Sequence, residues 1–376
     1  MALTRLTSAN AIPDDSIANV KMANIVQSKN IIINGDMQIA QRGTSAASVT
    51  GDGYKTVDRF INEMSSAGTW TLSQDTDVPS GYGFSSSLKY DCTTANGSLS
   101  AGSWGFISQR FEGQNLQYLN YGTSSAQKLT LSFWVKSVKT GTYIVEMVSF
   151  ATTKSQSQSY TISSASTWEK KTITFTGDTA TAIANSSARS FNLNFWLVAG
   201  TTYTSGTLNT SYNTTTNANR AVGQVNLADS TSNNFWITGI QLEAGDTASE
   251  FEFLPYDVNL LRCQRYFQCS FEQGVTPGNN EANYLMQDCS CYASNSCYFG
   301  TPLFCEMRAD PTCVYYTGNN SSSSGNKITY YNGGWTNGTA ANAVLTDKYV
   351  SASASISSSA NQSILLQYNY TFDSEL

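Results

Sequence analysis

Hydrophobic and polar residues alternate along most of the chain between about residues 30 and 256. In the stretch 128–136, the odd positions from 129 to 135 hold Leu, Leu, Phe and Val, and the even positions hold Thr, Ser, Trp and Lys. Because successive side chains of a β-strand point to opposite faces, this pattern predicts strands rather than helices. Similar alternating stretches, separated by turn residues, are 142–150, 168–176 and 191–198.

Two stretches, at 30–43 and 236–243, bracket this region, and we predict a β-strand at each. Many short strands with no helical periodicity between them are typical of antiparallel sandwiches. We therefore predict an all-β chain whose residues 30–256 form an antiparallel jelly-roll β-sandwich. The first stretch would open this sandwich and the second would close it.

Residues 1–29 differ in pattern from the region that follows. Pro13 lies near a possible helix start, and Ile17 and Val20 are three residues apart, a stripe too thin to fold alone. We predict a short N-terminal anchoring arm that becomes ordered by packing on copies of itself or on another protein. A disordered leader is the alternative interpretation.

Residues 257–376 form a compositionally different C-terminal part, for which we predict a smaller β-sandwich. Alternating stretches such as 363–372 favour strands here. This part also holds seven of the eight cysteines, between Cys263 and Cys313. They lack the paired CxxC spacing of a structural zinc site, so small buried thiols are the first interpretation and disulfides the second.

The composition excludes several classes of function. Charged residues are only 13% of the chain, the net charge is −6, and no run of Lys or Arg exceeds two, so we predict no nucleic-acid partner. The chain has no histidine, which excludes Ser-His-Asp triads, Cys-His dyads and every zinc site that uses histidine. No apolar stretch approaches the ~18 residues of a membrane span, and no secretory signal begins the chain, so we expect neither membrane insertion nor export by that route.

A succession of short motifs lies at 30–37, 41–43, 57–60, 107–113, 131–137, 168–173, 237–245, 251–256 and 263–267. In their order and spacing, these motifs resemble the tail-fibre and other receptor-binding appendage proteins of bacteriophages. The resemblance implies a carbohydrate-binding-module-like jelly roll and a homotrimer on the virion. It also implies attachment to tail or head proteins through residues 1–29 and a C-terminal tip that meets a host cell-surface glycan or receptor. A purely structural virion decoration protein and a polysaccharide depolymerase tailspike are the alternatives.

Binding of a glycan requires aromatic faces for the C–H surfaces of the sugar, with amides, hydroxyls or carboxylates beside them. Trp104 and Trp335 lie on Gly-rich turns, and Tyr330 and Tyr331 are close to Trp335. We predict these four residues as ligand-binding candidates. Core or rim packing is the interpretation for the tryptophans within clear strand patterns, which are Trp134, Trp196 and Trp236.

We predict no catalytic residues, because the acidic residues are scattered and the repeats of an elongated β-helix enzyme are absent. A glycosidase would need two carboxylates at a defined separation. The candidates for such a pair are Asp36, Asp58, Glu112, Glu146, Glu169 and Glu243.

The resemblance also raises the possibility of a structural calcium ion where the first and last strands of the jelly roll meet. The stretch 34–36 is similar to the opening of such a site, with Asp36 as its carboxylate. The closing strand, however, has Ile237, Thr238 and Gly239 where these modules usually place acidic residues. Backbone carbonyls and Glu243 could still supply oxygen ligands, and the alternative is that Asp36 caps a turn.

Overall fold

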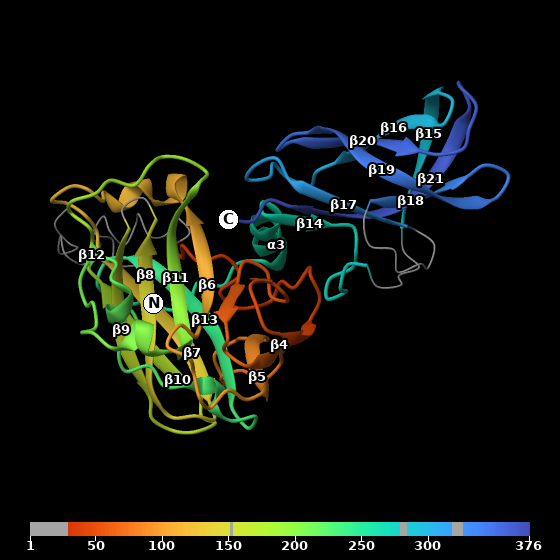
Figure 1. The fold of residues 1–376 in the computed structure, drawn as a ribbon. Coiled ribbons are helices and arrows are strands. Elements are labelled where there is room, and N and C mark those ends of the chain that lie inside the picture. Colours follow the sequence, from red (N-terminus) through yellow and green to blue (C-terminus); the bar gives the residue numbers. More distant parts are fainter. Residues whose placement is uncertain (1–28, 151–152, 279–283, 318–325) are drawn as a thin grey trace, which may run out of the picture.

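The computed structural model describes residues 29–150, 153–278, 284–317 and 326–376 (Figure 1). The described chain is almost entirely β, and every strand pair is antiparallel, as the alternating pattern predicted. It forms a two-sheet sandwich followed by a smaller barrel, with a short helix between them (Figure 1). Residues 1–28 of the predicted arm lie outside the described residues. Within the described part, no helix is long and apolar enough to span a membrane.

The sandwich has one six-stranded and one seven-stranded sheet. The six-stranded sheet runs in the order β1 (Ser45–Val49), β4 (Thr69–Asp75), β5 (Ser87–Thr94), β13 (Asn234–Ala244), β7 (Leu129–Ser137) and β10 (Glu169–Phe175). The seven-stranded sheet runs in the order β12 (Asn213–Thr214), β9 (Lys154–Ile162), β8 (Gly141–Ser149), β11 (Arg189–Ala199), β6 (Trp104–Glu112), β3 (Ile61–Ser65) and β2 (Gly53–Tyr54).

The core lies between the two sheets and is rich in aromatic residues. Phe133 on β7 meets Phe195 on β11 edge to face, with ring centroids 5.2 Å apart, and both are fully buried. The opposite face of β7 is largely buried as well, because the chain after β13 folds back over it. Thr130, for example, donates a hydrogen bond to the carbonyl of Gly245 at 2.9 Å. Alternation therefore identified the strand, although its polar face is also covered.

The prediction of a strand over residues 30–43 is wrong, whereas 236–243 lies within β13 as predicted. The first segment runs beside β13 and exchanges only scattered bonds with it, such as Ile240 N–H to the carbonyl of Gly35 at 2.9 Å. The reason is the asparagines. Asn30 binds backbone groups of β13 through its side chain, and Asn34 adopts a left-handed conformation while its amide holds the carbonyls of Ile39 and Asp58. Such side-chain bonds compete with a regular ladder.

The C-terminal part is β, as predicted, but its strands form one closed sheet instead of two facing sheets. The long strand β21 causes this closure, because its first half pairs with β15 and β18 and its second half with β14 and β17. The strands are β14 (Phe267–Cys269), β15 (Leu285–Ala293), β16 (Ser296–Pro302), β17 (Thr312–Thr317), β18 (Lys327–Tyr331), β19 (Trp335–Leu345), β20 (Tyr349–Ser355) and β21 (Ser363–Asp373).

All eight cysteines are free thiols, and all except Cys305 are buried. Cys289, Cys291 and Cys297 lie inside the barrel beside Phe299. Burial raises the pKa of Cys313 on β17 to about 12. This arrangement agrees with the first of the two interpretations of the cysteines, small buried thiols on strands.

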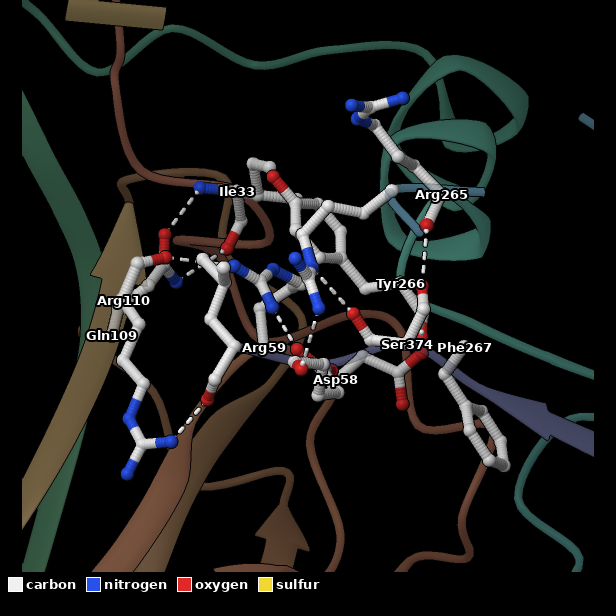
Figure 2. Close-up of polar contacts among 12 residues, drawn as sticks. Ile33, Asp58, Arg59, Gln109, Arg110, Arg265, Tyr266, Phe267 and Ser374 are labelled. Carbon is white, nitrogen blue, oxygen red and sulfur yellow. Dashed lines mark hydrogen bonds and ion pairs between the residues drawn. The ribbon is translucent and has the colours of Figure 1, made fainter. Parts of the chain in front are cut away.

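Helix α3 (Tyr256–Gln264), which the sequence pattern did not predict, begins at the predicted boundary between the two parts. Its buried face is anchored by Asn259, which donates to Asp36 at 3.1 Å and accepts from the backbone of Asn34 at 3.2 Å. A polar cluster next to α3 joins the sandwich to the barrel. In it the guanidinium of Arg59 lies 3.4 Å from the ring centroid of Tyr266 (Figure 2).

The last described residues complete this junction. Arg59 forms an ion pair with Glu375, and both side chains are buried. Arg42 forms an ion pair with Asp373 at 3.1 Å, and Arg308 donates to the carbonyl of Ser374 at 2.6 Å. The end of β21 is therefore fixed between the two modules (Figures 1 and 2).

Candidate functional site

A pocket of about 290 Å³ opens on the outer face of the seven-stranded sheet, away from the core. Its volume is near the lower end of the range for small-molecule sites, roughly 300–1,000 Å³. Residues of β3, β6, β8 and β11 form the floor, and the segment after β11, which includes α2 (Thr201–Thr204), forms a wall. The lining residues are Glu63, Trp104, Phe106, Val148, Phe150, Arg189, Asn192, Asn194, Trp196, Tyr203 and Arg220.

Strand register places the polar floor of the pocket in one row. Ser108 on β6 pairs with Asn194 on β11, which pairs with Glu146 on β8. The side chains follow the same order: Ser108 Oγ donates to Asn194 Oδ1 at 2.8 Å, and Asn194 Nδ2 donates to Glu146 Oε2 at 3.1 Å. Because each group already has a partner, the floor is rigid.

Glu146 is fully buried beneath the pocket and forms an ion pair with Arg220. Arg220 Nε donates to Oε1 at 2.7 Å and Nη2 to Oε2 at 2.9 Å, a bidentate arrangement. Burial disfavours the charged guanidinium, but Glu146 outweighs that effect and raises the pKa of Arg220. The indole N–H of Trp196 also donates to Glu146, at 3.2 Å.

Aromatic rings form the other side of the pocket. Phe106 lies between Trp104 and Trp196, with centroid distances of 5.2 and 5.0 Å, and Tyr203 of α2 lies 5.4 Å from Trp196. Phe106 and Trp196 are buried, whereas Trp104 and Tyr203 are partly exposed. Trp104 and Tyr203 therefore offer ring surface to a ligand. The sequence singled out Trp104 from a predicted Gly-rich turn, whereas the structure has it as the first residue of β6, and it missed Tyr203.

The rim of the pocket carries two further charged residues. Glu63 on β3 accepts from Arg110 Nη2 at 3.0 Å. Arg189, the first residue of β11, donates through Nε to Asn192 Oδ1 at 2.7 Å. No motif in the sequence marked either residue, because strand register brings them to the pocket from distant positions.

The other predicted ligand residues lie in the barrel, so they do not form one site with Trp104. Tyr330 is only 3% exposed and packs inside the barrel, which leaves its ring no surface for a ligand. Tyr331 and Trp335 are 47% and 41% exposed, with ring centroids 5.3 Å apart. Tyr292 and Tyr298 also lie on the outer surface and stack at 4.7 Å. These rings stand on open surface.

Each carboxylate considered from the sequence is held by a partner. Glu112 accepts from Arg265 at 2.9 and 2.8 Å, and Glu243 accepts from the backbone and hydroxyl of Ser249, both at 2.8 Å. The remaining bonds are Asp36 with Asn259, Asp58 with Gln41 and Arg42, Glu146 with Arg220, and Glu169 with Lys171.

The carboxylates considered as calcium ligands are also hydrogen-bonded to other residues of the protein. Burial is the main cause of the raised pKa of Asp36, and Glu243 is engaged in the turn that follows β13. Within the described ranges, no group of three or more Cys, Asp or Glu residues could hold a metal ion.

No protein-family model matches the chain, and no similar sequence was found among curated proteins. Solved structures that it resembles include a putative sugar-binding protein from Bacteroides thetaiotaomicron, at 12% identity over 57% of this chain and 100% of that chain, with a TM-score of 0.32. TmCBM61 in complex with β-1,4-galactotriose matches at 10% identity over 58% of this chain and 99% of that chain, with a TM-score of 0.29.

The enzymatically active domain of tailspike protein 4 from bacteriophage CBA120 also matches, at 12% identity and a TM-score of 0.31. That match covers 57% of this chain and 21% of the tailspike chain. Likeness at this level does not establish a shared family.

Proposed function

We propose that the sandwich is a glycan-binding module and that a sugar occupies the pocket beside Trp104. The observation that carries the proposal is the combination of two surfaces in one hollow. Trp104 and Tyr203 expose ring faces, and Asn192, Asn194 and Arg220 supply polar groups next to them. A sugar ring has apolar C–H faces and a polar edge of hydroxyls, so it matches both surfaces at once.

We propose binding without bond cleavage. Hydrolysis of a glycosidic bond requires a proton-donating carboxyl and a second carboxylate beside the scissile bond. Glu63 and Glu146, the acidic residues at this pocket, are each held by an arginine, and Glu146 is fully buried. Both carboxylates are therefore engaged in ion pairs within the protein, and neither stands free beside a bound sugar.

We further propose that the chain is a virion appendage, a tail fibre or similar structure, that attaches to the particle through residues 1–29 and forms a homotrimer. The ordered series of motifs between residues 30 and 267 supports this setting. The protein would be exposed on the surface of the virion, with its glycan sites toward the host. Sedimentation of the full chain at the mass of one copy would count against the trimer.

The test is retention of the full-length chain on a panel of bacterial cells and their extracted surface polysaccharides. We expect Trp104→Ala to weaken retention about 10-fold or more, the usual effect of removing a central aromatic contact. Trp335→Ala is the matched control, since it removes an exposed tryptophan from the barrel. Chain length of the polysaccharide is followed in the same samples.

Three outcomes would contradict the proposal. Loss of retention in Trp335→Ala alone would move the site to the barrel, as expected for a C-terminal tip. Shortening of the polysaccharide would identify a depolymerase. No retention on any surface, with a known host in the panel, would favour a structural decoration protein.

A further inference from the structure

The charges at the pocket do not cancel. Glu146 forms an ion pair with Arg220, and Glu63 forms one with Arg110. In the described part of the chain, Arg189 has no carboxylate within ion-pair distance, and its one side-chain hydrogen bond is from Nε to the neutral amide of Asn192. The pocket therefore keeps one uncompensated positive charge on its rim.

The other described arginines show how unusual this is. Five form ion pairs with carboxylates, and two donate to backbone carbonyls instead. Arg189 alone among the described arginines has neither kind of partner. A partly buried cation without a counter-charge is unfavourable, because it loses hydration that nothing replaces. The paired arginines are Arg42, Arg59, Arg110, Arg220 and Arg265, and those bound to carbonyls are Arg262 and Arg308.

The guanidinium of Arg189 is nevertheless held in place. Asn192 binds its Nε at 2.7 Å, and the ring centroid of Phe150 lies 3.5 Å from its central carbon. Both neighbours line the same pocket. These two contacts leave the two Nη groups as a fixed fork, the geometry that binds a carboxylate or phosphate through two parallel hydrogen bonds.

Arg189 remains charged under ordinary conditions. Burial, and then the nearby charge of Arg110, lower the pKa of Arg189 to about 10. A group with that pKa is protonated at neutral pH, so the fork presents a full positive charge to a ligand.

We propose that Arg189 binds an anionic group of the glycan, the carboxylate of an acidic sugar or a phosphate ester, and that the pocket thereby selects acidic over neutral polysaccharides. This inference rests on the proposed function, since it names the ligand class for the same pocket. The sugar ring lies against Trp104 and Tyr203, and its acidic substituent reaches the rim at Arg189.

The experiment uses the full-length chain and every polysaccharide of the panel that it retains. Each polysaccharide is tested untreated, after reduction of its carboxyl groups to alcohols, and after removal of its phosphate esters with cold hydrofluoric acid. We expect one of the two treatments to weaken binding about 10- to 100-fold, the range for loss of a charged hydrogen-bonded contact. The treatment that does so identifies carboxylate or phosphate as the anion.

Arg189→Gln should weaken binding of the untreated polysaccharide by a similar factor and cause no further loss on the neutralised one. The affinity of Arg189→Lys should lie between those of wild type and Arg189→Gln, because lysine keeps the charge and loses the two parallel hydrogen-bond donors. Lys128→Gln is the matched control, since it removes one exposed positive charge from the same module. Thermal melts verify that each variant folds. The treated polysaccharides test the need for an anionic group on the wild-type chain, so that part of the experiment does not depend on any substitution.

Equal binding of wild type and Arg189→Gln, or equal binding of treated and untreated polysaccharide, overturns this inference. If Trp104→Ala still weakens binding in that case, the glycan site stands and only the acidic ligand is refuted. If Trp104→Ala has no effect, or no polysaccharide is retained, the proposed function fails and this inference fails with it.

Discussion

The sandwich and the barrel both carry aromatic residues on their outer surfaces but use them differently. On the seven-stranded sheet, Trp104 and Tyr203 border a hollow, because the segment after β11 folds back over the sheet. On the barrel, Tyr331 and Trp335 stand on open surface at the β18–β19 hairpin. The comparison indicates that a covering segment, more than the number of aromatic residues, turns a sheet face into a pocket.

The largest effect that we expect concerns the junction between the two modules. Glu375→Ala would leave the buried Arg59 without its carboxylate, and we expect the free energy of unfolding to fall by about 3–5 kcal/mol. Glu306→Ala is the control, because its partner Lys348 is exposed and such pairs contribute less than about 1 kcal/mol. Urea unfolding followed by tryptophan fluorescence measures both. Equal stability of the two variants would show that the modules are not coupled through Arg59.

A glycine in each module gives the next comparison. Gly239 in β13 has a positive φ of 60°, and an added Cβ would lie 2.6 Å from the ring of Phe84 and 3.1 Å from that of Trp134. We expect Gly239→Ala to destabilise the chain by about 1–3 kcal/mol. Gly300 in β16 has open space around it, so Gly300→Ala should be neutral or stabilise by up to about 1 kcal/mol. Thermal melts measure both variants. A shift in melting temperature in the same direction for both variants would contradict this account.

The smallest effect concerns an ion pair of the sandwich, between the partly exposed Asp77 and the buried Lys136. Burial would raise the pKa of Asp77, but bonds from Lys136 and Trp168 outweigh it and lower the pKa below 3.8. The resulting stabilisation is present above pH 3.8 and is lost as the pH falls through the lowered pKa. At neutral pH we expect Asp77→Asn to cost less than about 1 kcal/mol, because Asp77 is partly exposed.

Thermal melts of wild type and Asp77→Asn across this pH range check the expected loss. The difference between them should shrink in acid. Asp246→Asn, which removes the carboxylate of an exposed pair with Lys128, is the control. A difference for Asp77→Asn that does not change with pH would contradict the assignment.

The strands were predictable because alternation depends only on local sequence. The stretch 128–136 became β7 (Leu129–Ser137), and 191–198 lies within β11. The segment 30–43 was mispredicted because Asn30 and Asn34 replace ladder bonds with side-chain bonds, which apolar composition does not reveal.

The candidate site was predictable only in part. Tyr330 and Tyr331 are adjacent in a strand, so one must point inward and the other outward. The alternation of side chains along the strand could therefore have shown that only one of the two is available to a ligand. Arg189 and Arg220 carry no local signal. Strand register and the folded-back segment after β11 bring them to Trp104, and a single sequence shows neither.

Strand β21 also sets the order in which the molecule can be completed during synthesis. Domains usually fold as units while the chain emerges from the ribosome at about 5–20 residues per second, N-terminal units first. The sandwich has all its strands once Ala244 has emerged, whereas the barrel cannot close until residues 363–373 follow. The ion pairs of Arg42 with Asp373 and of Arg59 with Glu375 can form only after that. A nascent chain stalled before Ser363 would thus present a finished sandwich carrying an open sheet of five strands, in the order β15, β16, β20, β19 and β18, while β14 and β17 would lack the strand they pair with.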